Sequence, residues 1–207
     1  MKTITKIATI AAIIAASFAS AKAAPINGNA EYIKSEGEGK SMVETNLFYE
    51  VAGVKGFTFV DFNEQGNTYF GKTTFTPKSG NGVRAQIIHG TAMPNQYGIG
   101  ITMKLPKVAG VSGSVYNVPL WVDREGEQLE KNIVGVSLGA KLPYDIGLFA
   151  FNEWNLRGAN GIASTYGEIG VTKNVGQFTL MYNPSLNGNG DATPELEQRV
   201  SIGFNFK

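Results

Sequence analysis

Long runs in which apolar and polar residues alternate are the feature that most constrains this chain. In the last run, 199–207, Val200, Ile202, Phe204 and Phe206 alternate with polar residues or glycine. A period of two residues is that of a β-strand with one apolar and one polar face. Glycine (26 residues) and the 20 Phe and Tyr residues also favour strands joined by tight turns. The sequence therefore predicts an all-β fold.

Turn-forming clusters such as "NEQGN" and "PKSGNG" divide the chain into about twelve alternating runs. No helix, domain linker or sequence repeat is evident, although 127–131 is charged and is expected to form a turn or a short helix. Twelve strands are predicted, with ten as the alternative. The runs are 29–36, 41–52, 56–63, 67–76, 82–91, 96–105, 110–122, 131–142, 146–156, 163–173, 176–183 and 196–206.

The N-terminus has the pattern of a secretory signal peptide. Lys2 and Lys6 precede an apolar run, 7–19, and Ala21 and Ala23 follow with the spacing of a signal-peptidase site. A membrane anchor is the alternative, but the run is shorter than a membrane-spanning helix. We therefore predict a signal peptide at 1–23 and one domain at 24–207.

Charge and cysteine content narrow the class of this exported domain. Cleavage removes three lysines and no acidic residue, so the net charge falls from +1 to −2, and no nucleic-acid partner is expected. The chain has no cysteine. An exported chain without disulfides needs a large core or a fully closed sheet.

Alternation alone is compatible with a soluble β-sandwich or a membrane barrel, because each has one apolar and one polar face. Three features favour the barrel. Many runs reach the roughly 9–11 residues that a tilted membrane strand requires. Glycines such as Gly98 and Gly135 recur inside runs, and aromatic residues such as Tyr97, Trp121 and Tyr144 gather near run ends. We predict a closed antiparallel transmembrane β-barrel.

If the aliphatic rows face lipid, the opposite faces line the lumen. In 43–51, for example, Val43 and Leu47 face lipid while Glu44 and Phe48 face inward. The predicted lumen residues are Glu44, Asn46, Phe48, Glu50, Phe59, Asp61, Lys72, Arg84, Gln86, Lys104, Tyr116, Lys141, Glu168 and Arg199. In "FNEWN", either Asn152 and Trp154 or Glu153 points inward.

The mixed charge of this wall argues against a single-sign ion filter. Aromatic rings that stack on a base, beside carboxylates and amides that bind hydroxyls, suit a neutral solute with a flat ring. The alternative for each charged residue is a structural ion pair. The candidate solute-binding and pore-lining residues are Glu44, Phe48, Glu50, Phe59, Asp61, Arg84, Tyr116, Lys141 and Glu168.

Two resemblances bear on function. The ending, with Phe204 and Phe206, resembles the terminal strand by which outer-membrane proteins engage their assembly machinery. The ordered segments "ETNLFYEVAG", "KGFTFVDF", "YFGKTTFTPKSG", "YGIGITMKLPKVAGVSGSVYNVPLWV", "NIVGVSLGAKLPY", "LFAFNEWN" and "SIGFNF" resemble the nucleoside-specific, Tsx-like outer-membrane channel family. This resemblance implies a monomeric twelve-stranded barrel with a narrow nucleoside channel.

The sequence thus predicts a passive outer-membrane channel for nucleosides or similar small polar solutes. One alternative is a small barrel with a structural, adhesive or receptor role and a plugged lumen, and another is a soluble secreted sandwich. No enzyme is predicted, because the single histidine, His89, has no nucleophile motif beside it. No residue cluster has metal-ligand spacing, and no cofactor is implied.

Overall fold

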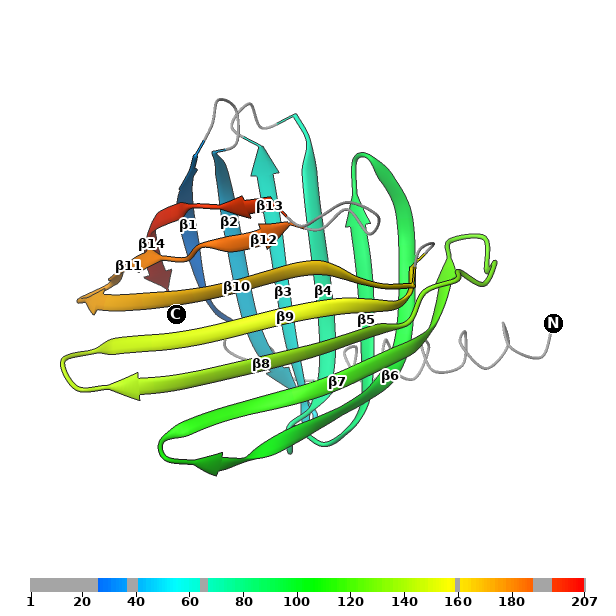
Figure 1. Cartoon of the computed structure of the whole chain (residues 1–207), viewed down its shortest axis with the longest axis horizontal. Coiled ribbons are helices and arrows are strands. Elements are labelled where there is room, and N and C mark those ends of the chain that lie inside the picture. Colours follow the sequence, from blue (N-terminus) through cyan, green and yellow to red (C-terminus); the bar gives the residue numbers. More distant parts are fainter. Residues whose placement is uncertain (1–25, 37–40, 64–66, 159–160, 188–194, 207) are drawn as a thin grey trace.

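A computed structural model describes residues 26–36, 41–63, 67–158, 161–187 and 195–206. The predicted signal peptide lies outside the described residues. The described chain forms antiparallel strands that wrap around one central space, and β1–β5 lie in the wall opposite β7–β10 (Figure 1). The strands are β1 (Asn27–Ser35), β2 (Met42–Val51), β3 (Val54–Asn63), β4 (Tyr69–Pro77), β5 (Gly82–Gly90), β6 (Met93–Val108), β7 (Val111–Asp123), β8 (Ile133–Leu142), β9 (Ile146–Gly158), β10 (Gly161–Val175), β11 (Phe178–Tyr182), β12 (Ser185–Asn187), β13 (Glu195–Glu197) and β14 (Arg199–Phe206).

The sheet closes on itself because β11 pairs with both β10 and β14. β1 pairs with β14 and with β2, and each later strand pairs with the next as far as β10. β11 and β12 together form one strand of the barrel wall, here called a stave, and β13 and β14 together form another. The described chain is therefore a closed twelve-stave barrel, which confirms the predicted fold class and strand number.

The break between β11 and β12 corrects the predicted end of the run at residue 183. Pro184 has no N–H to donate to a ladder, so pairing stops there and resumes at β12. The backbone groups around the break remain paired. The carbonyl oxygen of Pro184 accepts from the Ile169 N–H at 3.2 Å, and the Asn183 N–H donates to the Arg199 carbonyl at 3.0 Å.

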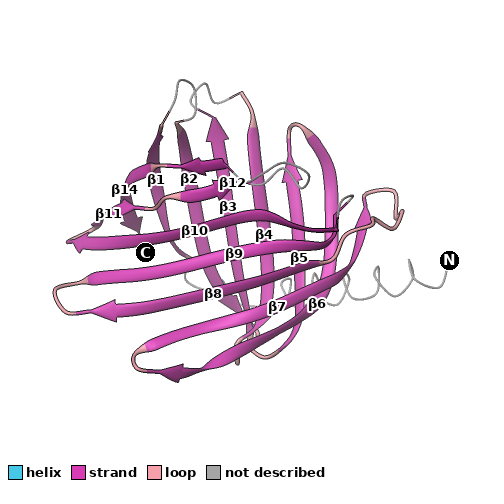
Figure 2. Cartoon of the chain, in the orientation of Figure 1, coloured by secondary structure: helices cyan, strands magenta, loops and turns pink. Residues whose placement is uncertain are grey.

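The described residues contain strands, turns and loops and no helix (Figure 2). Accordingly, none of the described segments is a helix that could cross a membrane. The segment 127–131, for which a turn or a short helix was expected, folds back on β7 instead. Val122 and Gln128 form an isolated bridge, and the Leu129 N–H donates to the Trp121 carbonyl at 2.9 Å.

The two ends of the barrel have different connections. At one end, here called the turn end, two-residue hairpins at 52–53 and 109–110 join β2 to β3 and β6 to β7. All four of their residues have positive φ, which type I′ hairpins require. Asn27 and Phe206, the first and last strand residues, lie at this end. The opposite loop end carries the longer connection 124–132. Short turns at one end and longer loops at the other are the arrangement of outer-membrane barrels.

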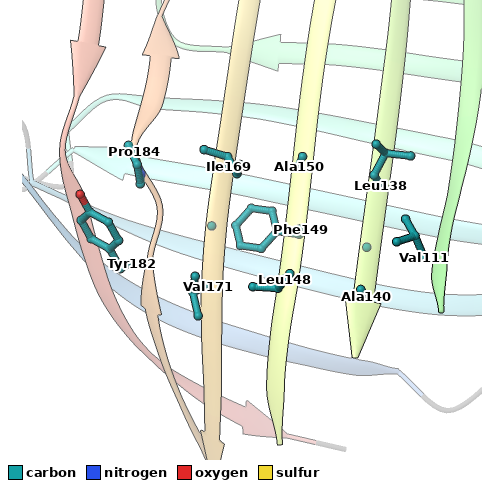
Figure 3. A pocket seen from close by; sticks show the side chains of 12 residues that line it. Val111, Leu138, Ala140, Leu148, Phe149, Ala150, Ile169, Val171, Tyr182 and Pro184 are labelled. Atoms are coloured by element: carbon teal, nitrogen blue, oxygen red, sulfur yellow. The ribbon is translucent and has the colours of Figure 1, made fainter. Parts of the chain in front are cut away.

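The distribution of side chains is the reverse of that in a soluble protein. Ile101 and Ile169, on the outward rows, are each 63% exposed, whereas Gln86 is 1% exposed and Glu31 is buried. The soluble sandwich is therefore excluded, because the aliphatic rows do not pack between two sheets. A shallow apolar groove of about 400 Å³ crosses the outer wall over β7–β11, lined in part by Leu138, Leu148 and Ile169 (Figure 3). We expect this exterior to contact lipid.

Leu138→Arg tests the orientation of the wall. Leu138 lies near the middle of β8 on the outward face, where a cation at the bilayer midplane costs about 2–4 kcal/mol. Insertion into bilayers, followed by the electrophoretic shift between folded and unfolded protein, should fall strongly while folding in detergent is retained.

Gly139→Arg is the matched control. A Cβ at Gly139 would meet only the Leu148 carbonyl oxygen, at 3.6 Å, so the inner wall has room for a side chain. This variant should insert as the native protein does. Equal insertion by both variants would contradict the assignment of faces.

Candidate functional site: the polar lumen

Side chains from opposite walls meet inside the barrel. Lys72 on β4 forms an ion pair with Glu153 on β9, five positions away in strand order. The Tyr116 hydroxyl donates to the same carboxylate. The Arg84 guanidinium lies 3.7 Å from the centre of the Tyr116 ring. With its amide oxygen turned toward Arg84, Gln86 accepts at 2.7 and 3.1 Å. We call Lys72, Arg84, Tyr116 and Glu153 the cross-bore bridge. The bridge decides between the two alternatives for the segment "FNEWN": Glu153 points inward.

An apolar cluster lies beside the bridge toward the loop end. Its buried members come from β5, β7 and β8, and the loop residue Leu129 packs against them. The buried members are Ile88, Tyr116, Val118, Trp121 and Ile133. Leu129 therefore anchors the 124–132 connection to this cluster, although Arg124, Glu125 and Gln128 in the same connection are exposed.

Lys131, in the same connection, adds a cation to this region. Its ammonium donates to the Gln96 side-chain oxygen at 2.9 Å and lies 4.3 Å from the centre of the Trp121 ring. Burial and the nearby positive charge of Lys72 lower the pKa of Lys131 to about 8, against the opposing effect of Glu153. Lys131 therefore loses its proton at a lower pH than an ordinary lysine does.

Four carboxylates form a separate acidic cluster. Three of them are adjacent in one row across β1, β2 and β3, because Glu31 lies opposite Glu44 and Glu44 lies opposite Asp61. The fourth, Glu168 on β10, interacts electrostatically with the other three. We call Glu31, Glu44, Asp61 and Glu168 the acidic cluster.

Arg199 lies beside the acidic cluster, but its hydrogen bonds go to other residues. It donates to the Glu197 carboxylate at 2.7 and 3.2 Å and to the Tyr166 hydroxyl at 3.3 Å. Tyr166 in turn donates to Glu168 at 2.9 Å. The lumen therefore has a cross-bore bridge rich in cations and, on β1–β3 and β10, a region rich in carboxylates.

An aromatic ladder runs along the inner wall from the turn end toward the loop end. Phe48 and Phe57 are stacked with ring centroids 4.9 Å apart, Phe57 and Phe59 are 6.1 Å apart, and Phe59 and Phe70 are 5.8 Å apart. Phe48 is 50% exposed although its row faces inward. Its ring is therefore accessible from the turn end.

The cross-strand registers place all nine predicted candidates on the inner face. The structure brings three carboxylates together in the acidic cluster and joins Arg84 to Tyr116 in the bridge. Phe48 and Phe59 belong to the ladder. Glu50 and Lys141 lie apart near the turn end, where Glu50 pairs with Lys78 at 2.7 Å. That any of the nine contacts a solute stays a prediction.

Sequence reasoning left out several inner-wall residues that the structure makes central. Glu31 lies opposite Glu44, and Phe57 lies opposite Phe48. The alternation of inward and outward residues along their strands was therefore enough to identify them. Lys131 carried no such indication, because it lies in a loop whose path only the folded barrel defines.

The described residues show no arrangement of three or more His, Asp or Glu side chains that could hold a metal ion. His89 lies on the outward row, opposite Gly71, with its ring 5.8 Å from that of Tyr69. It is therefore not part of the lumen.

Solved structures of small porins share this architecture. The KdgM porin matches with a TM-score of 0.60 over 87% of this chain and 99% of its own, at 8% sequence identity. The KdgM porin in complex with disordered oligogalacturonate gives 0.59 at 9% identity, over 87% of this chain and 99% of its own. The NanC porin gives 0.53 at 13% identity, over 88% of this chain and 100% of its own.

The fold is similar to that of the KdgM and NanC porins. At such low identity the likeness concerns the fold alone. No protein-family model matches the chain, and no curated protein matches it. The resemblance to the Tsx-like family therefore stays a prediction.

The contact between Lys131 and Trp121 should be visible in fluorescence. The chain has two tryptophans, so Trp154→Phe isolates Trp121. As the pH rises through about 8, Lys131 becomes neutral and its cation–π contact is lost. Trp121 emission should then change with a midpoint near pH 8. In Lys131→Met this transition should disappear, and an unchanged midpoint there would contradict the assignment.

Proposed function

We propose that this protein is a passive channel of the bacterial outer membrane for nucleosides or similar small polar solutes. The observation that carries the proposal is the closed barrel with an apolar exterior and an interior lined by hydrogen-bonding and charged groups. Transport needs no cofactor, since a solute crosses down its gradient through weak contacts. Export by the 1–23 signal peptide, insertion through the C-terminal strand and a monomeric state are part of the proposal.

The aromatic ladder supports a solute with a flat ring. A base can stack on an aromatic face with an energy of about 1–3 kcal/mol, and the exposed Phe48 ring offers the first such face near the turn end. Asn46 lies opposite Phe59 on the same inner face, and Glu44 and Asp61 follow it. Amide and carboxylate groups there supply partners for ribose hydroxyls.

The acidic cluster bears on the charge of the solute. Oligogalacturonate, present with one of the similar porins, is a polyanion. Three adjacent carboxylates on β1–β3 would repel such a molecule in this lumen. This charge distribution therefore favours a neutral or positively charged solute over an acidic oligosaccharide.

A plugged barrel with a structural, adhesive or receptor role is the second candidate, and one observation favours it. The Lys72–Glu153 pair joins opposite walls, and the apolar cluster fills the adjoining part of the lumen. The two candidates differ in a measurable property, because only a channel conducts in its native form.

Liposome swelling tests solute passage and its dependence on the ladder. Native protein should admit uridine and glycerol. Phe48→Ala with Phe57→Ala removes the accessible stacked pair and should reduce uridine uptake several-fold while leaving glycerol uptake nearly unchanged. Equal effects on both solutes would reject a stacking site.

Phe62→Ala is the control for this experiment. Phe62 is also on β3, but it lies on the outward row with its ring 6.2 Å from that of Tyr69. Its removal should not alter the ratio of uridine to glycerol uptake.

The double variant Lys72→Met/Glu153→Gln separates a channel from a plugged barrel. It removes both charges together, because a single change would leave an unpaired buried charge at a cost of about 3–5 kcal/mol. The native protein should already conduct in a planar bilayer. A silent native protein with a conducting double variant would establish the plugged barrel instead.

A further inference from the structure

The acidic cluster contains more negative charge than its protein neighbours neutralise. Glu31, Glu44 and Asp61 are direct cross-strand neighbours, and like charges in that position destabilise a sheet. Glu44 and Asp61 stand directly opposite each other on the inner face of β2 and β3. Two carboxylates so close require a proton or a cation between them.

The donors around the cluster are almost all neutral. Asn29 and Ser201 donate to Glu31, and Tyr166 and Asn183 donate to Glu168. Within the described ranges, no lysine or arginine forms an ion pair with any of the four carboxylates. The neighbouring Arg199 is bonded to Glu197, as described above.

A buried amide that bonds to the same cluster has an unpartnered oxygen. Asn183 is 4% exposed, and its Nδ2 donates to Glu168 at 3.2 Å. Its Oδ1 is enclosed and has no hydrogen-bond partner, and the same holds for Oδ1 of Asp61. Enclosed acceptors without donors are unfavourable. The site therefore lacks a group that has both positive charge and N–H donors.

The walls beside the cluster suit an organic cation. Phe70 lies opposite Asp61, and Phe59 precedes Asp61 by two residues on the same face. Aromatic faces attract ammonium groups and pack against alkyl carbons. A metal ion would instead require several converging oxygen ligands, and the described side chains do not form such a set.

We propose that the acidic cluster binds the primary ammonium group of a small organic amine that enters the lumen. The ammonium supplies three N–H donors and one positive charge, which suit the excess of carboxylates and the unpartnered oxygen of Asp61 within the cluster. The alkyl part lies against the aromatic ladder. The inference rests on the proposed channel for the route of entry and adds amines to the solutes of this lumen.

Conductance of the purified protein in a planar bilayer tests the site, with 1,4-diaminobutane as the probe. The amine should reduce single-channel current in a concentration-dependent manner. 1,4-Butanediol has the same length and no charge, and tetramethylammonium has a charge and no N–H donor. Both should be much weaker blockers. Equal block by either compound would overturn recognition of a primary ammonium.

Glu44→Gln and Asp61→Asn locate the site. Each keeps the shape of the side chain and removes a negative charge, so each should raise the half-blocking concentration at least about tenfold. Retention of the folded electrophoretic form shows that the variant barrels remain intact. Glu125→Gln removes an exposed carboxylate in the loop-end connection that pairs only with Arg124 among the described residues. It should leave the block unchanged.

Failure of this inference is distinguishable from failure of the proposed function. Conductance without amine block, or block that all three variants share equally, would overturn the ammonium site and leave the channel standing. Absence of conductance would overturn the channel. Calorimetric titration of 1,4-diaminobutane into the detergent-solubilised protein then decides the site: binding lost in Glu44→Gln supports it, and no binding to native protein overturns it.

Discussion

Closure of the hydrogen-bonded sheet is the constraint on which the rest of this structure depends. β11 completes it by pairing with β10 on one side and β14 on the other. A closed sheet satisfies its backbone groups internally and leaves no edge strand. The outer surface then needs no polar groups, and the aliphatic rows, Ile101 and Ile169 among them, can remain exposed on it.

The lumen is a consequence of the same closure. Most charged side chains of the strands converge inside, where they must bond to one another or to a solute. On one side the bonding is complete, because Lys72 and Tyr116 share Glu153 across the bore. On the other side the acidic cluster keeps unpartnered acceptors. The proposed recognition of a solute therefore involves the less satisfied side and the aromatic ladder beside it.

The sequence predicted most strands and the inner and outer face of each. It did not predict which inner side chains contact one another. Alternation placed Glu44, Arg84 and Glu168 on inner rows. It failed to resolve "FNEWN", because polar residues stand on both faces of β9 there, Asn152 outward and Glu153 inward. It also ended one run at residue 183, although the stave resumes beyond Pro184. Such a break interrupts the two-residue period on which the prediction relies.

The sequence by itself determined the all-β class, the approximate limits of the staves and the two faces of each, because a period of two is a local property of the backbone. Only the tertiary structure decided which inner residues meet. Lys72 and Glu153 are 81 residues apart, and Glu168 reaches the β1–β3 row only once β11 and β14 close the sheet. The register and closure of the sheet depend on the whole barrel. The sequence of one strand therefore does not specify which side chains of other strands it meets in the lumen.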